Sequence, residues 1–268
     1  MRIIDAQIHL WTNRQAPPHH ARAPYTVEQA LAGMDEAGVA RAINCPPFWD
    51  PAAIDYAAVA AAAHPDRLAT LGWFPVDAPA DETAVDRLLS MPGMLGLRLL
   101  FASPATIEAL MSERLEWLWD LAGAWEIPVA FGLPPMLLER VGEIAAGHPR
   151  MRVMIDHLAV SPFDKLPAAA GHFDALLALA QRPNVAIKAT AVPSMASQPF
   201  PFTDTHDHLR RFFDAYGAAR MFWGTDITRM QASWRQCIQL FTEELPWLRG
   251  RDLDLIMGDA VADWVRWP

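Results

Sequence analysis

The sequence predicts a single α/β domain, a (β/α)8 TIM barrel. Eight short runs rich in β-branched and aromatic residues alternate with alanine- or leucine-rich runs of helical length. Strict alternation implies parallel strands, because each helix returns the chain to the start of the next strand. The length of 268 residues is normal for one such barrel. No glycine- or serine-rich linker interrupts the chain, so one domain is expected over residues 1–268.

The expected strands are short apolar runs bounded by turn residues: Arg2–Ile8, Arg41–Cys45, Leu68–Phe74, Leu95–Phe101, Pro128–Gly132, Arg152–Asp156, Val185–Ala189 and Arg220–Gly224. The expected helices lie between them: Thr26–Ala37, Ala52–Ala63, Asp81–Leu89, Leu115–Trp125, Met136–Ala146, Ala168–Ala180, Thr205–Tyr216 and Trp234–Leu245. A further amphipathic run, Leu253–Val265, predicts an extra C-terminal helix. Two long proline-rich loops, Thr12–Pro24 and Pro193–Phe202, are expected to frame the barrel mouth.

The composition indicates a large buried core and an acidic surface. Hydrophobic residues make up 52% of the chain, and the formal net charge is −9. That charge argues against binding nucleic acid or an anionic membrane by bulk electrostatics, so a small-molecule substrate is the expected partner. The two cysteines, Cys45 and Cys237, form no C-x-x-C pair, and no signal-peptide or membrane-spanning pattern is present. A cytoplasmic location is expected, and a homodimer is expected as the commonest oligomeric state.

Function is expected at the carboxyl ends of the strands, where the active sites of such barrels lie. The first strand ends with Asp5, Gln7 and His9 at alternate positions, and alternation would point all three into the barrel. Ile4 and Ile8 would then face the helices. Polar groups on the inner face of an apolar strand are costly unless they have partners or a function. A satisfied hydrogen-bond cluster is the alternative.

Basic side chains stand alone in two apolar strands. Arg98 suits bidentate binding of a carboxylate, with a buried ion pair to a core acid such as Asp5 as the alternative. Lys188 shares its side of the strand with Ala186 and Thr190, a small and polar set that could line the lumen. The sequence leaves open whether Lys188 binds substrate or pairs with an acid.

The sixth and eighth strands end in residues suited to acid–base chemistry. His157 is a candidate acid or base, with a hydrogen-bonded core histidine as the alternative. Asp226 follows an apolar strand and Gly224, where its carboxylate could bind a metal or take a proton from water. Arg229 is expected either to hold an anionic substrate or to be exposed to solvent. No phosphate-binding loop and no G-x-S-x-G sequence occurs, so nucleotide-dependent and serine-hydrolase chemistry have no motif.

In their order and spacing, several segments resemble the amidohydrolase-related family of the amidohydrolase superfamily. They are Ile4–Trp11, Gly96–Arg98, Ile155–Leu158 and Phe222–Asp226, followed by Phe241–Trp247 and Ile256–Gly258. The resemblance covers nearly the whole chain and implies a hydrolase built on a TIM barrel. The chain is most similar to the lactonase-like branch that includes pyrone dicarboxylate lactonase.

The resemblance also implies where metal ligands would lie. Metal-dependent relatives use two histidines of a D-x-H-x-H motif, a third histidine from strand five and the aspartate of strand eight. In this chain Gln7 replaces the first histidine, and the strand-five run Val129–Gly132 contains none. Zinc sites use about three protein ligands plus water, so His9 and Asp226 alone would bind zinc weakly. We therefore expect no metal; the alternative is one Zn²⁺ or Mn²⁺ held by His9, His157 and Asp226.

The similarity to a lactonase that needs no metal implies a mechanism. Asp226 would take a proton from water, and the water would attack the carbonyl of a small carboxylated or aromatic-derived lactone or ester. The donors to the developing oxyanion would be His157, His9 and Gln7. Arg98 would hold a carboxylate or the carbonyl. The expected substrate-binding residues are thus Gln7, Arg98 and Lys188, beside the catalytic Asp226, His157 and His9.

Two other functions stay open. One is a metal-dependent decarboxylase or amide hydrolase of the same superfamily, which would bind one divalent ion per chain. The other is a non-catalytic barrel that only binds a small molecule, a hypothesis motivated by the two missing ligands.

Overall fold

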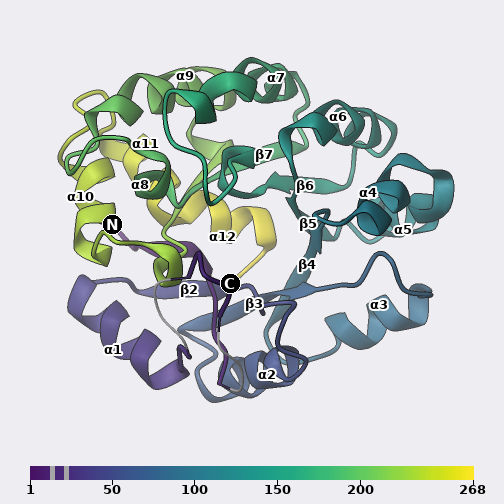
Figure 1. The fold of residues 1–268 in the computed structure, drawn as a ribbon. Helices are drawn as coiled ribbons and strands as arrows, with labels where there is room; N and C mark the ends of the chain where they lie inside the picture. Colours follow the sequence, from purple (N-terminus) through teal and green to yellow (C-terminus); the bar gives the residue numbers. More distant parts are fainter. Residues whose placement is uncertain (13–15, 21–23) are drawn as a thin grey trace.

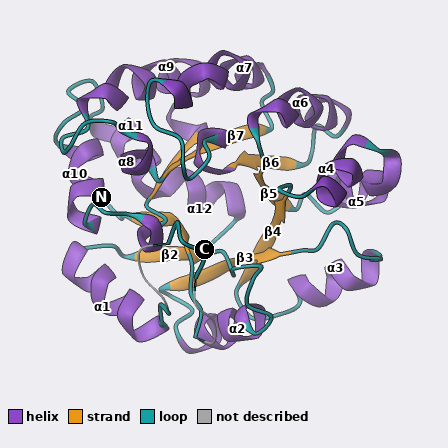
Figure 2. Cartoon of the chain, in the orientation of Figure 1, coloured by secondary structure: helices purple, strands orange, loops and turns teal. Residues whose placement is uncertain are grey.

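The computed structural model describes residues 1–12, 16–20 and 24–268. Eight parallel strands form one sheet in chain order, and the sheet curls into a nearly closed barrel with helices around it (Figure 1, Figure 2). The strands are β1 (Ile4–Ile8), β2 (Arg41–Asn44), β3 (Leu68–Trp73), β4 (Met94–Leu100), β5 (Pro128–Gly132), β6 (Arg152–Ile155), β7 (Val185–Thr190) and β8 (Met221–Gly224). The predicted TIM barrel is confirmed.

The outer helices follow the predicted order. They are α1 (Val27–Ala37), α2 (Ala53–Ala63), α3 (Glu82–Leu89), α5 (Glu116–Ala124), α6 (Leu138–Gly147), α7 (Phe173–Ala178), α9 (His206–Tyr216) and α10 (Trp234–Thr242). The segment expected as one helix over Ala168–Ala180 is shorter, because 3-10 turns flank α7. Two short helices were not predicted, α4 (Pro104–Met111) and α8 (Val192–Met195).

The C-terminal segment closes the end of the barrel at which the strands begin. It consists of α11 (Gly250–Asp254), a π turn and α12 (Ala260–Val265). Gly258 in the π turn lies against Arg2 and Ile4 at the start of β1, where a Cβ atom would be 2.4 Å from the Arg2 carbonyl oxygen. Val261 packs with the apolar side chains that fill the barrel interior. The open end is therefore the one at which the strands end.

An irregularity in β1 changes which of its side chains face the interior. The register of β1 against β2 shifts between Asp5 and Ile8, as in a β-bulge. Ile4 packs in the interior cluster and Ile8 in the outer layer. Gln7 and His9 point inward, as predicted. The predicted inward position of Asp5 and outward position of Ile4 are wrong, because strict alternation took no account of the bulge.

Asp5 instead joins β1 to the end of β8. Its Oδ1 accepts hydrogen bonds from the backbone N–H groups of Gln7 (3.0 Å) and Thr225 (2.9 Å). Its Oδ2 accepts from the Thr225 hydroxyl (2.5 Å) and the Trp234 indole (2.8 Å). The backbone N–H of Asp226 donates to the Gln7 carbonyl at 2.8 Å. Among the described residues β1 and β8 form no regular ladder, so these bonds close the barrel seam.

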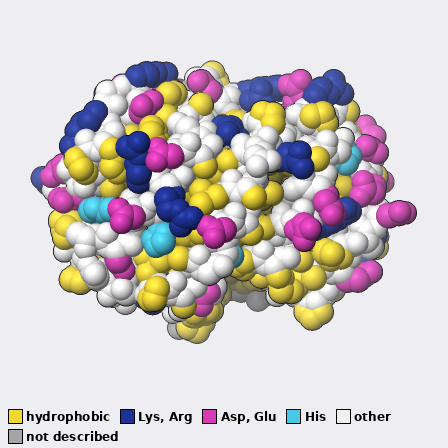
Figure 3. Space-filling view, turned by 90° about the horizontal axis from the view of Figure 1, so that it is seen from above, with side chains coloured by type: hydrophobic (Ala, Val, Ile, Leu, Met, Phe, Trp, Pro, Cys, Tyr) yellow, Lys and Arg dark blue, Asp and Glu magenta, His cyan; other side chains and the backbone are white. Residues whose placement is uncertain are grey.

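The surface bears charges of both signs. Figure 3 shows one face of the molecule, on which acidic and basic side chains are interspersed with apolar ones. Within the part of the chain that the structure describes, no helix combines the length and the apolar character needed to cross a membrane.

Replacing Asp5 by asparagine tests the seam. An amide would turn an NH₂ group toward two of the four buried donors and leave them without acceptors. We expect Asp5→Asn to lower the free energy of unfolding by about 2–4 kcal/mol, measured by urea denaturation. The exposed Asp252 on α11 gives the matched control, and Asp252→Asn is expected to change little. Equal unfolding curves for the two variants would contradict this role of Asp5.

Candidate active site

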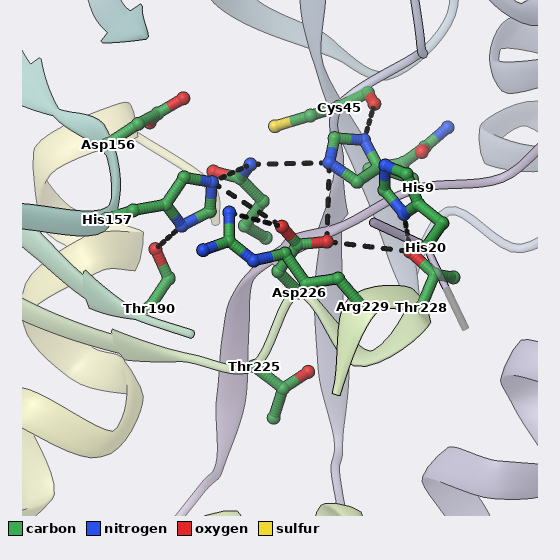
Figure 4. A network of polar contacts seen from close by, with 12 residues as sticks. His9, His20, Cys45, Asp156, His157, Thr190, Thr225, Asp226, Thr228 and Arg229 are labelled. Carbon is green, nitrogen blue, oxygen red and sulfur yellow. Dashed lines mark hydrogen bonds and ion pairs between the residues drawn. The ribbon is translucent and has the colours of Figure 1, made fainter. Parts of the chain in front are cut away.

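Three predicted catalytic side chains converge at the open end of the barrel. Figure 4 shows His9 and His157 on either side of Asp226. His9 Nε2 lies 3.4 Å from Asp226 Oδ1, and His157 Nε2 lies 3.5 Å from Asp226 Oδ2. All three side chains are nearly buried, with exposed fractions of 5%, 11% and 2% for His9, His157 and Asp226. The structure thus brings together residues from the ends of β1, β6 and β8.

Backbone geometry turns two of these residues into the site. His157 has φ 53° and Asp226 has φ 50°, so both lie in the left-handed region. That conformation costs a residue with a Cβ atom about 1–2 kcal/mol, and such strained residues cluster at functional sites. Each residue lies two positions after the last residue of its strand, at a left-handed turn.

The orientation of the Gln7 amide follows from its neighbours. Lys188 donates to Gln7 Oε1 and lies 2.9 Å from Asp156 Oδ1. An ammonium group can only donate, so the amide oxygen faces Lys188 and the NH₂ group faces the histidines. Gln7 Nε2 lies 3.0 Å from His157 Nε2 and 3.4 Å from His9 Nε2. The amide therefore donates to both imidazoles, and both Nε2 atoms are acceptors.

The remaining ring nitrogens agree with this assignment. His9 Nδ1 bonds the Cys45 carbonyl, which can only accept, so Nδ1 carries the proton. His157 Nδ1 lies 2.7 Å from the Thr190 hydroxyl. Burial lowers the pKa of His9 to about 4 and the pKa of His157 well below its usual range. At neutral pH both rings are uncharged and present a lone pair at Nε2.

Asp226 is ionised in this environment. Burial alone would raise the pKa of its carboxyl group, but interactions with His9 and His157 in their protonated forms, and with the Arg229 guanidinium, hold that pKa below its ordinary value. Arg229 Nη1 lies 3.6 Å from Asp226 Oδ2, and its side chain is 6% exposed. Of the two alternatives for Arg229, exposure to solvent is wrong.

Arg98 and Lys188 both pair with Asp156. Arg98 Nε donates to Asp156 Oδ2 at 2.7 Å, and Lys188 takes the other carboxylate oxygen. Burial opposes ionisation of Asp156, but the two cations hold its pKa below the usual range. The ion-pair alternative for Arg98 is thus correct, although its suggested partner Asp5 is not. Among the described residues only Nε of Arg98 is engaged, so its other N–H groups remain available to a ligand.

A cavity of about 410 Å³ opens above this cluster. Its polar floor includes His9, Arg98, His157, Asp226 and Arg229. Gln7 and Lys188, predicted to bind substrate, do not border the cavity. Lys188 contacts Gln7, and Gln7 contacts both histidines, so these two residues influence a ligand by positioning the histidines.

Sequence reasoning missed His20. It lies in the loop expected over Thr12–Pro24, of which residues 13–15 and 21–23 are outside the described residues. His20 Nδ1 lies 2.8 Å from the Thr228 hydroxyl, which donates to Asp226 Oδ1 at 3.5 Å (Figure 4). Burial lowers the pKa of His20 to about 3. The available signal was a pair of adjacent histidines shortly after the first strand.

The residues present do not fit a resident metal ion. Among residues 1–12, 16–20 and 24–268, no three His, Cys, Asp or Glu side chains form a group that could hold one. The Gln7 amide already donates to the two imidazole lone pairs that an ion would need. The inward positions of β5 are Ala130 and Gly132, which supply no ligand.

The fold and site define a TIM-barrel enzyme with an aspartate–histidine centre at the carboxyl ends of its strands. The sequence model of the amidohydrolase family matches residues 4–260, and the chain belongs to that family. This confirms the family expected from the sequence.

Relatives of known name support this assignment. The chain is 29% identical over 161 residues to L-fucono-1,5-lactonase of Burkholderia ambifaria, an alignment that covers 59% of this chain and 54% of the relative. The chain thus matches about half the length of that relative. It has the fold of a Burkholderia multivorans amidohydrolase with bound zinc (TM-score 0.84, 17% identity, 100% of both chains). A putative 2-pyrone-4,6-dicarboxylic acid hydrolase from Pseudomonas putida is also similar (TM-score 0.78, 18% identity, 99% and 98% covered).

Lys188→Met tests the buried charge cluster. The variant leaves Asp156 with one cation instead of two and frees the Gln7 amide to rotate. We expect the free energy of unfolding to fall by about 3–5 kcal/mol, measured by urea denaturation. The sequence has one other lysine, the exposed Lys165, so Lys165→Met is the matched control. A Lys188 variant as stable as that control would argue against the cluster.

Proposed function

We propose that the chain hydrolyses a small lactone or ester by attack of a water molecule that Asp226 deprotonates. The observation that carries the proposal is the meeting of the Asp226 carboxylate with the imidazoles of His9 and His157 on the floor of a cavity. Membership of the amidohydrolase family and the partial match to a protein named L-fucono-1,5-lactonase support hydrolysis of a lactone.

The acceptors suit the activation of water. A water molecule needs an acceptor for the proton it loses, and the ionised Asp226 carboxylate, which borders the cavity, is that acceptor. The water's lone pair then points toward the substrate carbonyl. As the new C–O bond forms, Asp226 takes one proton from the water. The ring or ester C–O bond then breaks, and the leaving alkoxide takes that proton from Asp226, which restores the base. A general base contributes about 10²–10⁴ in rate.

The proposed roles of the basic residues follow from their free donors. The histidines were expected to donate to the oxyanion, but their Nε2 atoms accept hydrogen bonds from Gln7. Arg229 is the basic side chain paired with Asp226, and its buried Nε has no hydrogen-bond partner among the described residues. We therefore assign the oxyanion to Arg229 and an acidic group of the substrate to Arg98, since a guanidinium binds carboxylates well.

The proposal favours esters over amides. Asp226 is a weak base beside Arg229, because the guanidinium lowers the pKa of its carboxyl group. Lactones and esters are activated enough for such a base, whereas an unactivated amide demands more.

Asp226→Asn tests the proposed base. A screen of lactones and esters first identifies a substrate, and kcat and KM are then measured on it. We expect kcat to fall by about 10²–10⁴ with the fold retained, because the amide cannot accept the proton. Asp207 is an exposed aspartate on α9, so Asp207→Asn should keep full activity. Undiminished kcat in Asp226→Asn would rule out the mechanism.

The low histidine pKa values predict the acid limb of the activity profile. His9 has a pKa of about 4, so its Nε2 keeps the lone pair until the pH falls through that value. We expect kcat/KM to hold level down to roughly pH 5 and to fall below it, measured in buffers of constant ionic strength. An acid limb near pH 6.5, the ordinary pKa of histidine, would mean that an unburied imidazole controls the rate.

Metal analysis tests whether the proposed hydrolysis depends on an ion. We expect protein purified without added metal to contain far less than one zinc or manganese per chain and to keep its activity in a chelator. Gln7→His removes the amide donor and adds an imidazole, so this variant should bind more metal than the parent. One tightly bound ion per parent chain, with activity lost on its removal, would overturn the metal-free mechanism.

A further inference from the structure

The cavity has two unlike sides. The floor carries the charged and imidazole groups, whereas the wall formed by the ends of β4, β5 and β6 and by the segment after β2 is apolar. Its lining side chains include Phe48, Leu100, Ile107, Leu133, Pro134 and Val160. Of the described residues on this wall, Ser161 has the one hydroxyl group and Trp49 the one indole N–H. The indole nitrogen is buried and has no hydrogen-bond partner among the described residues.

Local sequence explains why the wall is apolar. Ser103 caps α4 through a capping box with Thr106, and Pro104 occupies the first turn. The helix therefore begins directly after β4 and brings Ile107 to the cavity. At the end of β5, a Cβ atom on Gly132 would lie 2.7 Å from Leu100 Cδ1 and 3.6 Å from Arg98 Nη2. Because Gly132 has no side chain, Leu100 fills this position beside Arg98.

This wall would bind a sugar lactone poorly. Each hydroxyl group of such a substrate needs a hydrogen-bond partner once it leaves water. A hydrocarbon group gains from the same wall, because burial of apolar surface is favourable. The cavity volume of about 410 Å³ lies in the range of pockets that hold drug-sized ligands, so there is room for more than a bare lactone ring.

We infer that the substrate is a lactone with an acidic group and an aromatic or aliphatic hydrocarbon substituent, and not a polyhydroxylated sugar lactone. The inference rests on the proposed hydrolysis and specifies its substrate. The acidic group faces Arg98, the carbonyl lies over Asp226, and the hydrocarbon arm lies along Leu100, Ile107 and Leu133. Hydrolysis adds one water, so the product is a hydroxy acid that keeps the arm.

Three six-membered lactones test the inference on the wild-type protein. The first bears a carboxylate and a phenyl or hexyl arm, the second bears the carboxylate alone, and the third is L-fucono-1,5-lactone. We expect kcat/KM to be at least about tenfold higher for the first than for the second, and lowest for the third. Equal values for the first two, or the highest value for the sugar lactone, would overturn the inference while leaving lactone hydrolysis intact. Hydrolysis of none of the three, nor of any lactone in the wider screen, would instead defeat the proposed function.

A variant pair locates the arm. Ile107→Ser should lower kcat/KM about tenfold for the arm-bearing lactone, mainly through KM, and much less for the lactone without the arm. Met111 is exposed on the same helix and does not border the cavity, so Met111→Ser is the matched control and should act on both lactones like the parent. Equal losses on both lactones in Ile107→Ser would contradict the placement of the arm.

Discussion

The ammonium group of Lys188 lies inside the barrel between the Asp156 carboxylate and the Gln7 amide oxygen. Because this group can only donate, it fixes the amide, and the amide in turn fixes both imidazoles as acceptors at Nε2. The two Nε2 atoms thus carry no proton, and the ionised Asp226 carboxylate is the proton acceptor that borders the cavity. This arrangement of acceptors favours activation of water over protonation of a substrate. The Gln7 amide hydrogens also occupy the position that a metal ion bound to both imidazoles would need.

The same residues that shape the site close the barrel. The backbone N–H of Asp226 donates to the carbonyl of Gln7, and Asp5 ties Thr225 to the first strand. Carboxylate and amide are therefore held together by the seam between β1 and β8. The bulge in β1 serves both functions, because it turns Asp5 outward to the seam and leaves Gln7 and His9 facing inward. Changes at the seam should consequently disturb catalysis as well as stability.

The fold and the meeting of His9, His157 and Asp226 could be predicted from sequence, because the ends of parallel strands meet at one end of a barrel. Other features depend on details that a pattern does not contain. One extra residue in β1 reversed the sides of Ile4 and Asp5. His20 contacts Thr228 across 208 positions, so its place in the site depends on the path of a loop. The Ser103-Pro104 pair is a sequence signal for the start of helix α4. The helix was missed because two helices, α4 and α5, lie between β4 and β5, whereas the alternating pattern predicts one.

The protonation of the two site imidazoles tests the account most directly. Nitrogen NMR of ¹⁵N-labelled protein at neutral pH distinguishes a protonated from an unprotonated ring nitrogen in each histidine. The account predicts that His9 and His157 are both uncharged, with the proton on Nδ1 and a bare, hydrogen-bonded Nε2. A proton on Nε2 of either ring would contradict it, because the Gln7 amide could then not donate to that ring.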